Sequence, residues 1–216
     1  VARSPTINSS GFFGDLTGTV KNLILKGGSG NLAGLNIGHA AFVGKLQGLL
    51  ENCALIDSSF YLNSGNGTDS MSPFVADLYH GTISRCFVQN VTLTITSLHD
   101  YSNYVAMLCG RARRGTIQDC FVLGTLNSND TDGRDTRNAG CVSVTGEWTV
   151  NTSRVYSAIS FGGSYPFIVN ASLRDDSDMN ATDCFYDYEL AGFTDGKGTP
   201  KTTAEMKTQS TYTNWD

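Results

Sequence analysis

The sequence predicts an all-β fold in which short strands stack as successive coils of a solenoid. Three observations support it: an apolar pattern recurring about every 33 residues, strand-like alternation within each copy, and a composition suited to turns. The 216-residue chain has 24 glycines and only 16% charged residues, which favours a turn-rich β protein over a helical one. Its 40% of hydrophobic residues is enough for a continuous core.

The repeat is clearest in residues 11–25, which read GFFGDLTGTVKNLIL. The end of this segment matches Leu50–Leu55, Ile83–Val88 and Ile117–Val122, with weaker copies at Arg154–Ser157 and Ala181–Tyr186. The equivalent positions lie 30, 33, 34, 35 and 29 residues apart and hold Leu23, Cys53, Cys86, Cys120, Val155 and Cys184. Because one coil cannot bury its own inner face, the copies must stack to form a core.

Within one copy the apolar positions follow the spacing i, i+3, i+5, as in Ile83, Cys86 and Val88. An amphipathic helix would place them at i, i+3, i+4 and i+7 instead. The step from i+3 to i+5 is strand alternation, and the step of three predicts a bend at the two polar residues between. Regular alternation at Val91–Thr96 predicts a further strand.

The repeat pattern ends after Cys184. Residues 194–200 have turn chemistry, and Thr202-Thr203-Ala204-Glu205 has the form of a capping box that begins a short helix to about Thr208. Such a helix can close the end of a solenoid, where strand edges would otherwise stay unpaired. We therefore expect a repeat array over residues 1–190 and a cap over 191–216, in a chain that continues in a longer protein.

Composition and sequons favour an extracellular or cell-surface protein. The net charge of −5 disfavours nucleic acid, which needs clustered Lys and Arg, and no apolar run of 18 residues is present to span a membrane. Seven N-glycosylation sequons exceed the number expected by chance. They begin at Asn8, Asn66, Asn90, Asn129, Asn151, Asn170 and Asn180.

The six cysteines are Cys53, Cys86, Cys109, Cys120, Cys141 and Cys184. They form no CxxC motif and no paired Cys/His spacing, which disfavours zinc and allows up to three disulfides. Cys53, Cys86, Cys120 and Cys184 share one position of the repeat. The first three are in consecutive copies, so stacked coils would place neighbouring Cα atoms about 4.8 Å apart, inside the disulfide range. Parallel Cβ vectors make that geometry imperfect. A ladder of buried free thiols and one or more disulfides are both open on this evidence.

The repeat G-[FL]-F-G-x-L-x-G-x-[IV]-x-N-[LC]-x-[LV] resembles the GLUG repeat of bacterial and protist surface proteins. The first copy is the closest match, and the second keeps Gly44, Leu46, Gly48, Asn52 and Cys53. The tail over 201–216 is similar to the segment that follows such arrays. The resemblance implies a right-handed parallel β-helix, here of about five to six coils with long loops and a short C-terminal capping helix. It carries no catalytic residues to transfer.

Three groups of side chains offer chemistry, although a solvated surface is the simplest interpretation of each. Asp175, Asp176, Asp178, Asp183, Asp187 and Glu189 crowd one stretch, and a polysaccharide-cleaving enzyme needs paired carboxylates. Arg111, Arg113 and Arg114, expected on a turn before Gly115, suit an anionic glycan. His39, His80 and His99 lie at unrelated places in their coils and predict no metal site.

Two outward patterns bear on binding. Phe87 and Phe121 are in register on adjacent copies and are expected to pack as a ladder or, if exposed, to stack a sugar. Thr92, Thr94 and Thr96 point to one face of their strand. The neighbouring segments 57–59 and 124–127 do not show a matching threonine ladder, which argues against ice binding.

Together these features predict an extracellular structural or adhesive segment of a cell-surface or filament-forming glycoprotein, with no catalytic residues, metal or cofactor. The expected partners are further copies of the chain, other surface proteins or glycans. The alternatives are a polysaccharide-cleaving enzyme, either a lyase or a hydrolase, and a glycan-binding module on the same scaffold.

Overall fold

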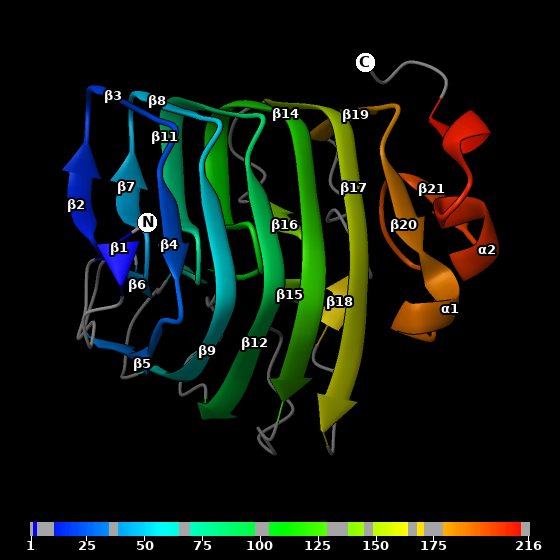
Figure 1. The fold of residues 1–216 in the computed structure, drawn as a ribbon, viewed down its shortest axis with the longest axis horizontal. Helices are drawn as coiled ribbons and strands as arrows, with labels where there is room; N and C mark the ends of the chain where they lie inside the picture. Colours follow the sequence, from blue (N-terminus) through cyan, green and yellow to red (C-terminus); the bar gives the residue numbers. More distant parts are fainter. Residues whose placement is uncertain are drawn as a thin grey trace.

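The computed structural model is a parallel β-solenoid of about four turns with a short C-terminal helix (Figure 1). It describes residues 2–3, 11–34, 39–64, 70–97, 104–128, 138–144, 149–163, 168–170 and 179–212. The all-β solenoid predicted from the repeat is therefore confirmed. The number of turns is lower than the five to six coils predicted. One reason is that the last repeat copy adds only two strands, both paired with β17, and completes no further turn within the described residues.

One side of the solenoid, which we call the long sheet, faces the reader in Figure 1. It contains long strands, and each of them pairs in parallel with the equivalent strand of the next coil. The strands are β1 (Ala2–Arg3), β4 (Ile24–Lys26), β5 (Ser29–Gly34), β9 (Ala54–Ser64), β12 (Phe87–Ser97), and the C-terminal parts of β14 (Cys109–Ser128) and β17 (Val150–Gly163).

Two shorter faces complete each coil. The first contains β2 (Phe13–Leu16), β7 (Val43–Leu46), the start of β11 (Val75–Ser84), the start of β14, and β16 (Val142–Val144). The second contains β3 (Thr19–Lys21), β8 (Leu49–Glu51), the end of β11, the middle of β14, the start of β17, and β19 (Met179–Thr182). Small parallel pairings add β6 (His39–Ala40), β10 (Ser70–Ser72) and β13 (Tyr104–Val105), and β15 (Asn138–Ala139) with β18 (Ile168–Asn170).

The residues that the repeat aligns are the residues that pair between neighbouring coils in the structure. The backbone N–H of Ala54 donates to the Leu23 carbonyl, that of Phe87 to Cys53, and that of Phe121 to Cys86. The predicted i, i+3, i+5 pattern is also the pattern of burial, because Ile83, Cys86 and Val88 are fully buried. One core runs through the stack, since equivalent apolar side chains of neighbouring coils lie in contact.

The bend predicted between the apolar positions is confirmed in every copy. One polar residue of each copy adopts the left-handed conformation with φ between 50° and 58°. These residues are Asn22, Asn52, Arg85, Asp119, Arg154 and Asp183. Asn and Asp tolerate this conformation because their short polar side chains bond locally, whereas arginine pays the steric cost of about 1–2 kcal/mol and is held there by its neighbours.

A column of glycines marks the bend between the two shorter faces. A Cβ on Gly48 would lie 1.9 Å from the carbonyl oxygen of Gly18, and one on Gly115 would lie 2.4 Å from that of Gly81. No side chain fits at such a distance from backbone. Gly48, Gly81 and Gly115 are therefore needed for close approach between coils.

The C-terminal segment closes one end of the stack (Figure 1). The edge strand β20 (Phe185–Asp187) pairs with β21 (Thr199–Lys201), and α1 (Tyr188–Ala191), α2 (Thr203–Met206) and a 3-10 turn (Gln209–Thr211) follow in the chain. The predicted capping box is confirmed, since the Thr202 side chain accepts from the Glu205 N–H and the Glu205 carboxylate accepts from the Thr202 N–H. The sheet continues beyond the last anchor of the repeat, because β20 pairs with β17 and β21 pairs with β20.

The core predicts a large cost for truncating one inward side chain. Ile83→Ala should lower the free energy of unfolding by about 2–5 kcal/mol, because a fully buried side chain leaves a cavity. The matched control is Thr82→Ala, which changes the neighbouring outward position and should alter stability by about 0.5 kcal/mol or less. Urea denaturation followed by circular dichroism measures both. Equal effects of the two substitutions would contradict the assigned register.

Candidate functional site

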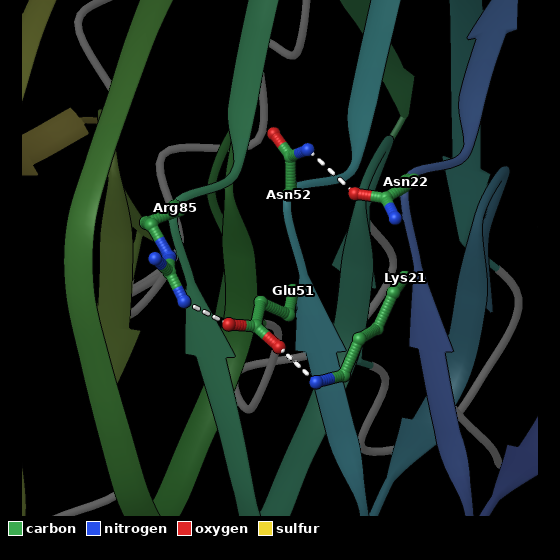
Figure 2. Close-up of a pocket in the computed structure, with 5 residues that line it drawn as sticks. All are labelled: Lys21, Asn22, Glu51, Asn52 and Arg85. Atoms are coloured by element: carbon green, nitrogen blue, oxygen red, sulfur yellow. Dashed lines mark hydrogen bonds and ion pairs between the residues drawn. The ribbon is translucent and has the colours of Figure 1, made fainter.

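A shallow groove of about 490 Å³ runs across three coils at the left-handed bends (Figure 2). We call it the bend groove. Its lining consists of Lys21, Asn22, Glu51, Asn52 and Arg85. Lys21 and Glu51 end β3 and β8, and the other three residues lie in the bends that follow β3, β8 and β11. The stacking of the repeat therefore places all five side by side.

The bend groove is built from pairings between coils. The Glu51 carboxylate accepts from Lys21 Nζ at 2.5 Å on one side and from the Arg85 guanidinium on the other. Asn52 Nδ2 donates to Asn22 Oδ1 at 2.6 Å. The Glu51 side chain is 16% exposed, whereas those of Lys21 and Arg85 are 53% and 64% exposed. The carboxylate therefore lies at the floor of the groove between two cations.

The two cations set the acidity of the Glu51 carboxyl group. The hydrogen bond from Lys21, together with that from Arg85, lowers the pKa of Glu51 below its ordinary value. A glycosidase needs two carboxyl groups, one of them with a raised pKa so that it can donate a proton. Glu51 is the one carboxylate among the five lining residues, and its pKa is shifted the other way. The geometry therefore suits cross-coil pairing of Glu51 with Lys21 and Arg85.

The same type of pairing recurs along the bends. Asp119 accepts from the Arg154 guanidinium, with Nη2 at 3.0 Å from Oδ2. Asn90 Nδ2 donates to Asp57 Oδ1 at 2.8 Å, and Asn180 Nδ2 donates to Asn151 Oδ1 at 3.0 Å. Sequence reasoning missed these ladders. The signal was available in the aligned copies, where Lys21 and Glu51, or Asp119 and Arg154, occupy equivalent positions with opposite charge.

The arginine cluster differs from its prediction. Arg111, Arg113 and Arg114 lie inside β14 and not on a turn. Arg111 Nη2 and Arg113 Nε each donate at 3.1 Å to the carboxylate of Asp77, which is 2% exposed. Arg113 also lies over the ring of Tyr79 at 4.7 Å. Two of the three arginines thus neutralise a buried carboxylate, which would be costly if left unpaired.

All six cysteines are buried free thiols. Cys53, Cys86 and Cys120 form the predicted ladder, continued by Val155 and Cys184. In all four ladder cysteines Sγ lies 3.0–3.3 Å from the carbonyl oxygen two residues earlier. At four of the six left-handed bends a thiol therefore donates to the carbonyl just before the bend. The aliphatic side chains of Leu23 and Val155 at the other two cannot do so. Cys109 and Cys141 lie outside this column, on the first short face.

Contact between the thiols also changes their acidity. The hydrogen bond with Cys86 lowers the pKa of Cys53 to about 7 and raises the pKa of Cys86. Burial raises the pKa of Cys120 to about 12 and that of Cys109 and Cys141 above its ordinary value. Both side chains of the coupled pair are fully buried, so this acidity is not presented to solvent.

The acidic C-terminal stretch holds the cap in place. Asp187 is 3% exposed, accepts from the Leu190 N–H at the start of α1, and accepts from Thr203 Oγ1 at 2.8 Å. Glu189 accepts from the Thr203 N–H at 2.8 Å, and Asp183 occupies a bend. The two carboxylates of the cap therefore join α1 to α2. Asp175, Asp176 and Asp178 lie outside the described residues.

Of the predicted sequons, Asn90, Asn151 and Asn180 have exposed side chains. Asn170 lies in β18, and Asn8, Asn66 and Asn129 fall outside the described residues. His39 is buried in β6 and His80 is exposed in β11, while His99 is not described. No cluster of three metal-ligating side chains occurs in the described part of the chain. Nor does that part include a helix with the length and apolar character to cross a membrane.

The predicted aromatic ladder is present on the outside of the long sheet. The rings of Phe87 and Phe121 stack with centroids 4.7 Å apart and an interplanar angle of 7°. Tyr156 and Phe185 continue the column in the next coils, and the Tyr212 ring packs against both at 5.8 Å. The Tyr212 hydroxyl donates to the Met206 carbonyl at 2.7 Å. The C-terminal segment thus packs on the outer face as well as on the end of the stack.

The chain matches no protein-family model, and no curated protein or solved structure shows significant similarity to it. The likeness to the GLUG repeat therefore stays a prediction, whereas the parallel β-solenoid that it implies is present.

The thiol ladder predicts unreactive cysteines. Protein purified without reductant should react only slowly with Ellman's reagent in the native state, because burial excludes the reagent and keeps most thiols protonated. After unfolding in guanidinium chloride, six thiols per chain should react. Four or fewer reactive thiols in the unfolded protein would show that a disulfide forms.

Glu51 predicts a specific pH dependence. Its pKa is lowered in the folded state, so its contribution to stability is full above the ordinary carboxyl pKa and is lost as pH falls through the lowered value. In urea denaturation, the difference between wild type and Glu51→Gln should be largest at neutral pH and shrink on acidification. A difference that is constant with pH would contradict the cross-coil pairing of Glu51. Asn52→Gly, which changes a neighbouring lining residue in a left-handed bend and neither removes nor adds a carboxylate, is the control.

Proposed function

We propose that this chain is a structural or adhesive segment of an extracellular, cell-surface or filament-forming glycoprotein, built as GLUG-repeat surface proteins are expected to be. The observation that carries the proposal is the use of its charged side chains. Glu51, Asp77 and Asp119 each bond to a cation on a neighbouring coil. A scaffold that must resist separation of its coils needs such pairings, because each coil contacts only its neighbours.

The same observation disfavours the polysaccharide-cleaving alternative. A lyase or hydrolase on this scaffold needs carboxylates and a base that converge on one outer face. The carboxylates Asp187 and Glu189, which sequence reasoning associated with such chemistry, accept hydrogen bonds from the capping helices. Their positions support closure of the solenoid, and Asp187 is buried at 3% exposure.

Features of the surface support the extracellular assignment. The side chains of Asn90, Asn151 and Asn180 are exposed, so a glycan on any of them would extend into solvent. The buried thiols are also compatible with an oxidising compartment, because access limits their oxidation. A glycan-binding module is the second candidate, favoured by the uncharged outer face of the long sheet.

Secretion from a eukaryotic host, behind a signal peptide, tests the proposal. We expect a folded product whose mass falls on treatment with an N-glycosidase, with the shift reduced in Asn90→Gln, Asn151→Gln or Asn180→Gln. The same preparation should release no reducing ends or unsaturated products from a panel of polysaccharides. Cleavage that is lost in Asp183→Asn would contradict the proposal, and so would retention of the unglycosylated protein inside the cell.

A further inference from the structure

The outer face of the long sheet carries a column of hydroxyl groups that sequence reasoning did not find. Pairing in register aligns one hydroxyl residue from each of five adjacent strands of the long sheet, β5, β9, β12, β14 and β17. They are Ser29, Ser59, Thr92, Thr125 and Ser160. All five are exposed or half-exposed. Thr125 is the one other threonine in this column, so the expected threonine ladder is absent, but serines complete a column of hydroxyls. A bulge at Asn90 shifts the register by one residue and places Thr92 beside Thr125.

The next outward column is also uncharged. It contains Asn31, Tyr61, Thr94, Asn127 and Gly162. Tyr61 is 54% exposed, which is the largest exposed fraction among the big apolar or aromatic side chains of the described residues. Exposed faces of soluble proteins normally carry charges of both signs. Ten aligned positions without a charge therefore indicate a face suited to an uncharged partner.

An apolar strip borders the hydroxyl columns. Its apolar members are the half-exposed Ile56, Leu123 and Ala158, and the stacked rings of Phe87 and Phe121 lie beside it. The exposed Gln89 interrupts the strip between Ile56 and Leu123, and Lys26 pairs with Ile56 at its end. The rings stack on each other, so they offer edges to solvent and little ring face. The ring of Tyr61 is the exposed aromatic surface beside the hydroxyls. The face thus combines hydroxyl and amide groups, which both donate and accept, with a flat apolar border.

We propose that this face binds an extended, uncharged polysaccharide of the β-1,4-linked type, lying along the solenoid axis. Such a chain presents hydroxyl groups at a regular repeat and apolar C–H faces. The first column offers one hydroxyl per strand, about 4.8 Å apart. A sugar chain lying along the solenoid axis can therefore bond to a line of protein hydroxyls. The long strands lie side by side in Figure 1. A ribbon-like chain fits such a sheet, whereas a helical glucan does not.

Charge complementarity selects the class of glycan. Lys26 and Asp57 are the charged residues at the margin of this face, and they pair with each other at 3.0 Å. An anionic polysaccharide would find no unpaired cation there among the described residues, whereas a neutral one meets matching donors and acceptors. This inference rests on the proposed adhesive role, because it names the ligand of an adhesive surface. It involves no bond breaking.

The test is retention on insoluble cellulose, chitin and mannan, with protein made in bacteria so that Asn90, which borders the face, carries no glycan. The variant Thr92→Lys/Thr125→Lys changes two aligned hydroxyls of the column. The matched control is Thr82→Lys/Thr116→Lys, which changes another aligned and half-exposed threonine pair from the same two coils, on the second short face. Both variants place two lysines one strand spacing apart, so their effects on folding should be similar.

We expect wild type to bind at least one of these polysaccharides, with affinity falling about tenfold or more in Thr92→Lys/Thr125→Lys and about twofold or less in the control. Tyr61→Ala should also weaken binding. No retention on any of the three polymers, an equal loss in both lysine variants, or binding only to alginate or heparin would overturn the inference. Thermal hysteresis without polysaccharide binding would assign the face to ice and overturn it as well.

The two proposals fail separately. A secreted, glycosylated and non-cleaving protein that binds none of the polymers would remove the ligand and leave the structural role. Cleavage of a polymer would instead remove the structural role, whatever its affinity for the face.

Discussion

Hydrogen bonding between equivalent backbone groups of successive coils is the constraint on which this structure depends. A parallel stack satisfies each strand with the next copy of itself, so the register repeats from Leu23 to Cys53 and Cys86. Any residue type that is favourable at one coil is then brought next to its counterpart at strand spacing. Columns of glycine, thiol, aromatic ring and hydroxyl follow from this one relation.

The bends show how side chains maintain that register. A left-handed residue turns each coil, a cysteine thiol bonds to the carbonyl before the turn in four copies, and glycine allows the coils to approach at the other bend. Ion pairs such as Glu51 with Lys21 and Arg85 then join one coil to the next on the outside. The charges are thereby used in the scaffold, which explains why the groove in Figure 2 has polar walls without a catalytic pair.

The cap and the ion pairs are unevenly distributed over the solenoid. At the C-terminal end, β21 covers the edge of β20, and Asp187 and Glu189 fasten the capping helices. The short faces carry the ion pairs of Asp77 and Glu51, whereas the long sheet presents aligned hydroxyls with few charges. The distribution concentrates the ion pairs on the short faces and leaves few charges on the outer face of the long sheet.

The sequence by itself determined the solenoid, the period, the inward column from Leu23 to Cys184, the bends and the capping box, because each depends on local spacing that a repeat displays. It did not determine the number of turns, the pairing of Arg111 and Arg113 with Asp77, or the free state of the thiols. Those depend on which atoms meet across coils. The hydroxyl column needed the tertiary structure for the same reason: the bulge at Asn90 shifts the strand by one residue, and only the register of the folded sheet shows that Thr92 lies beside Ser59 and Thr125.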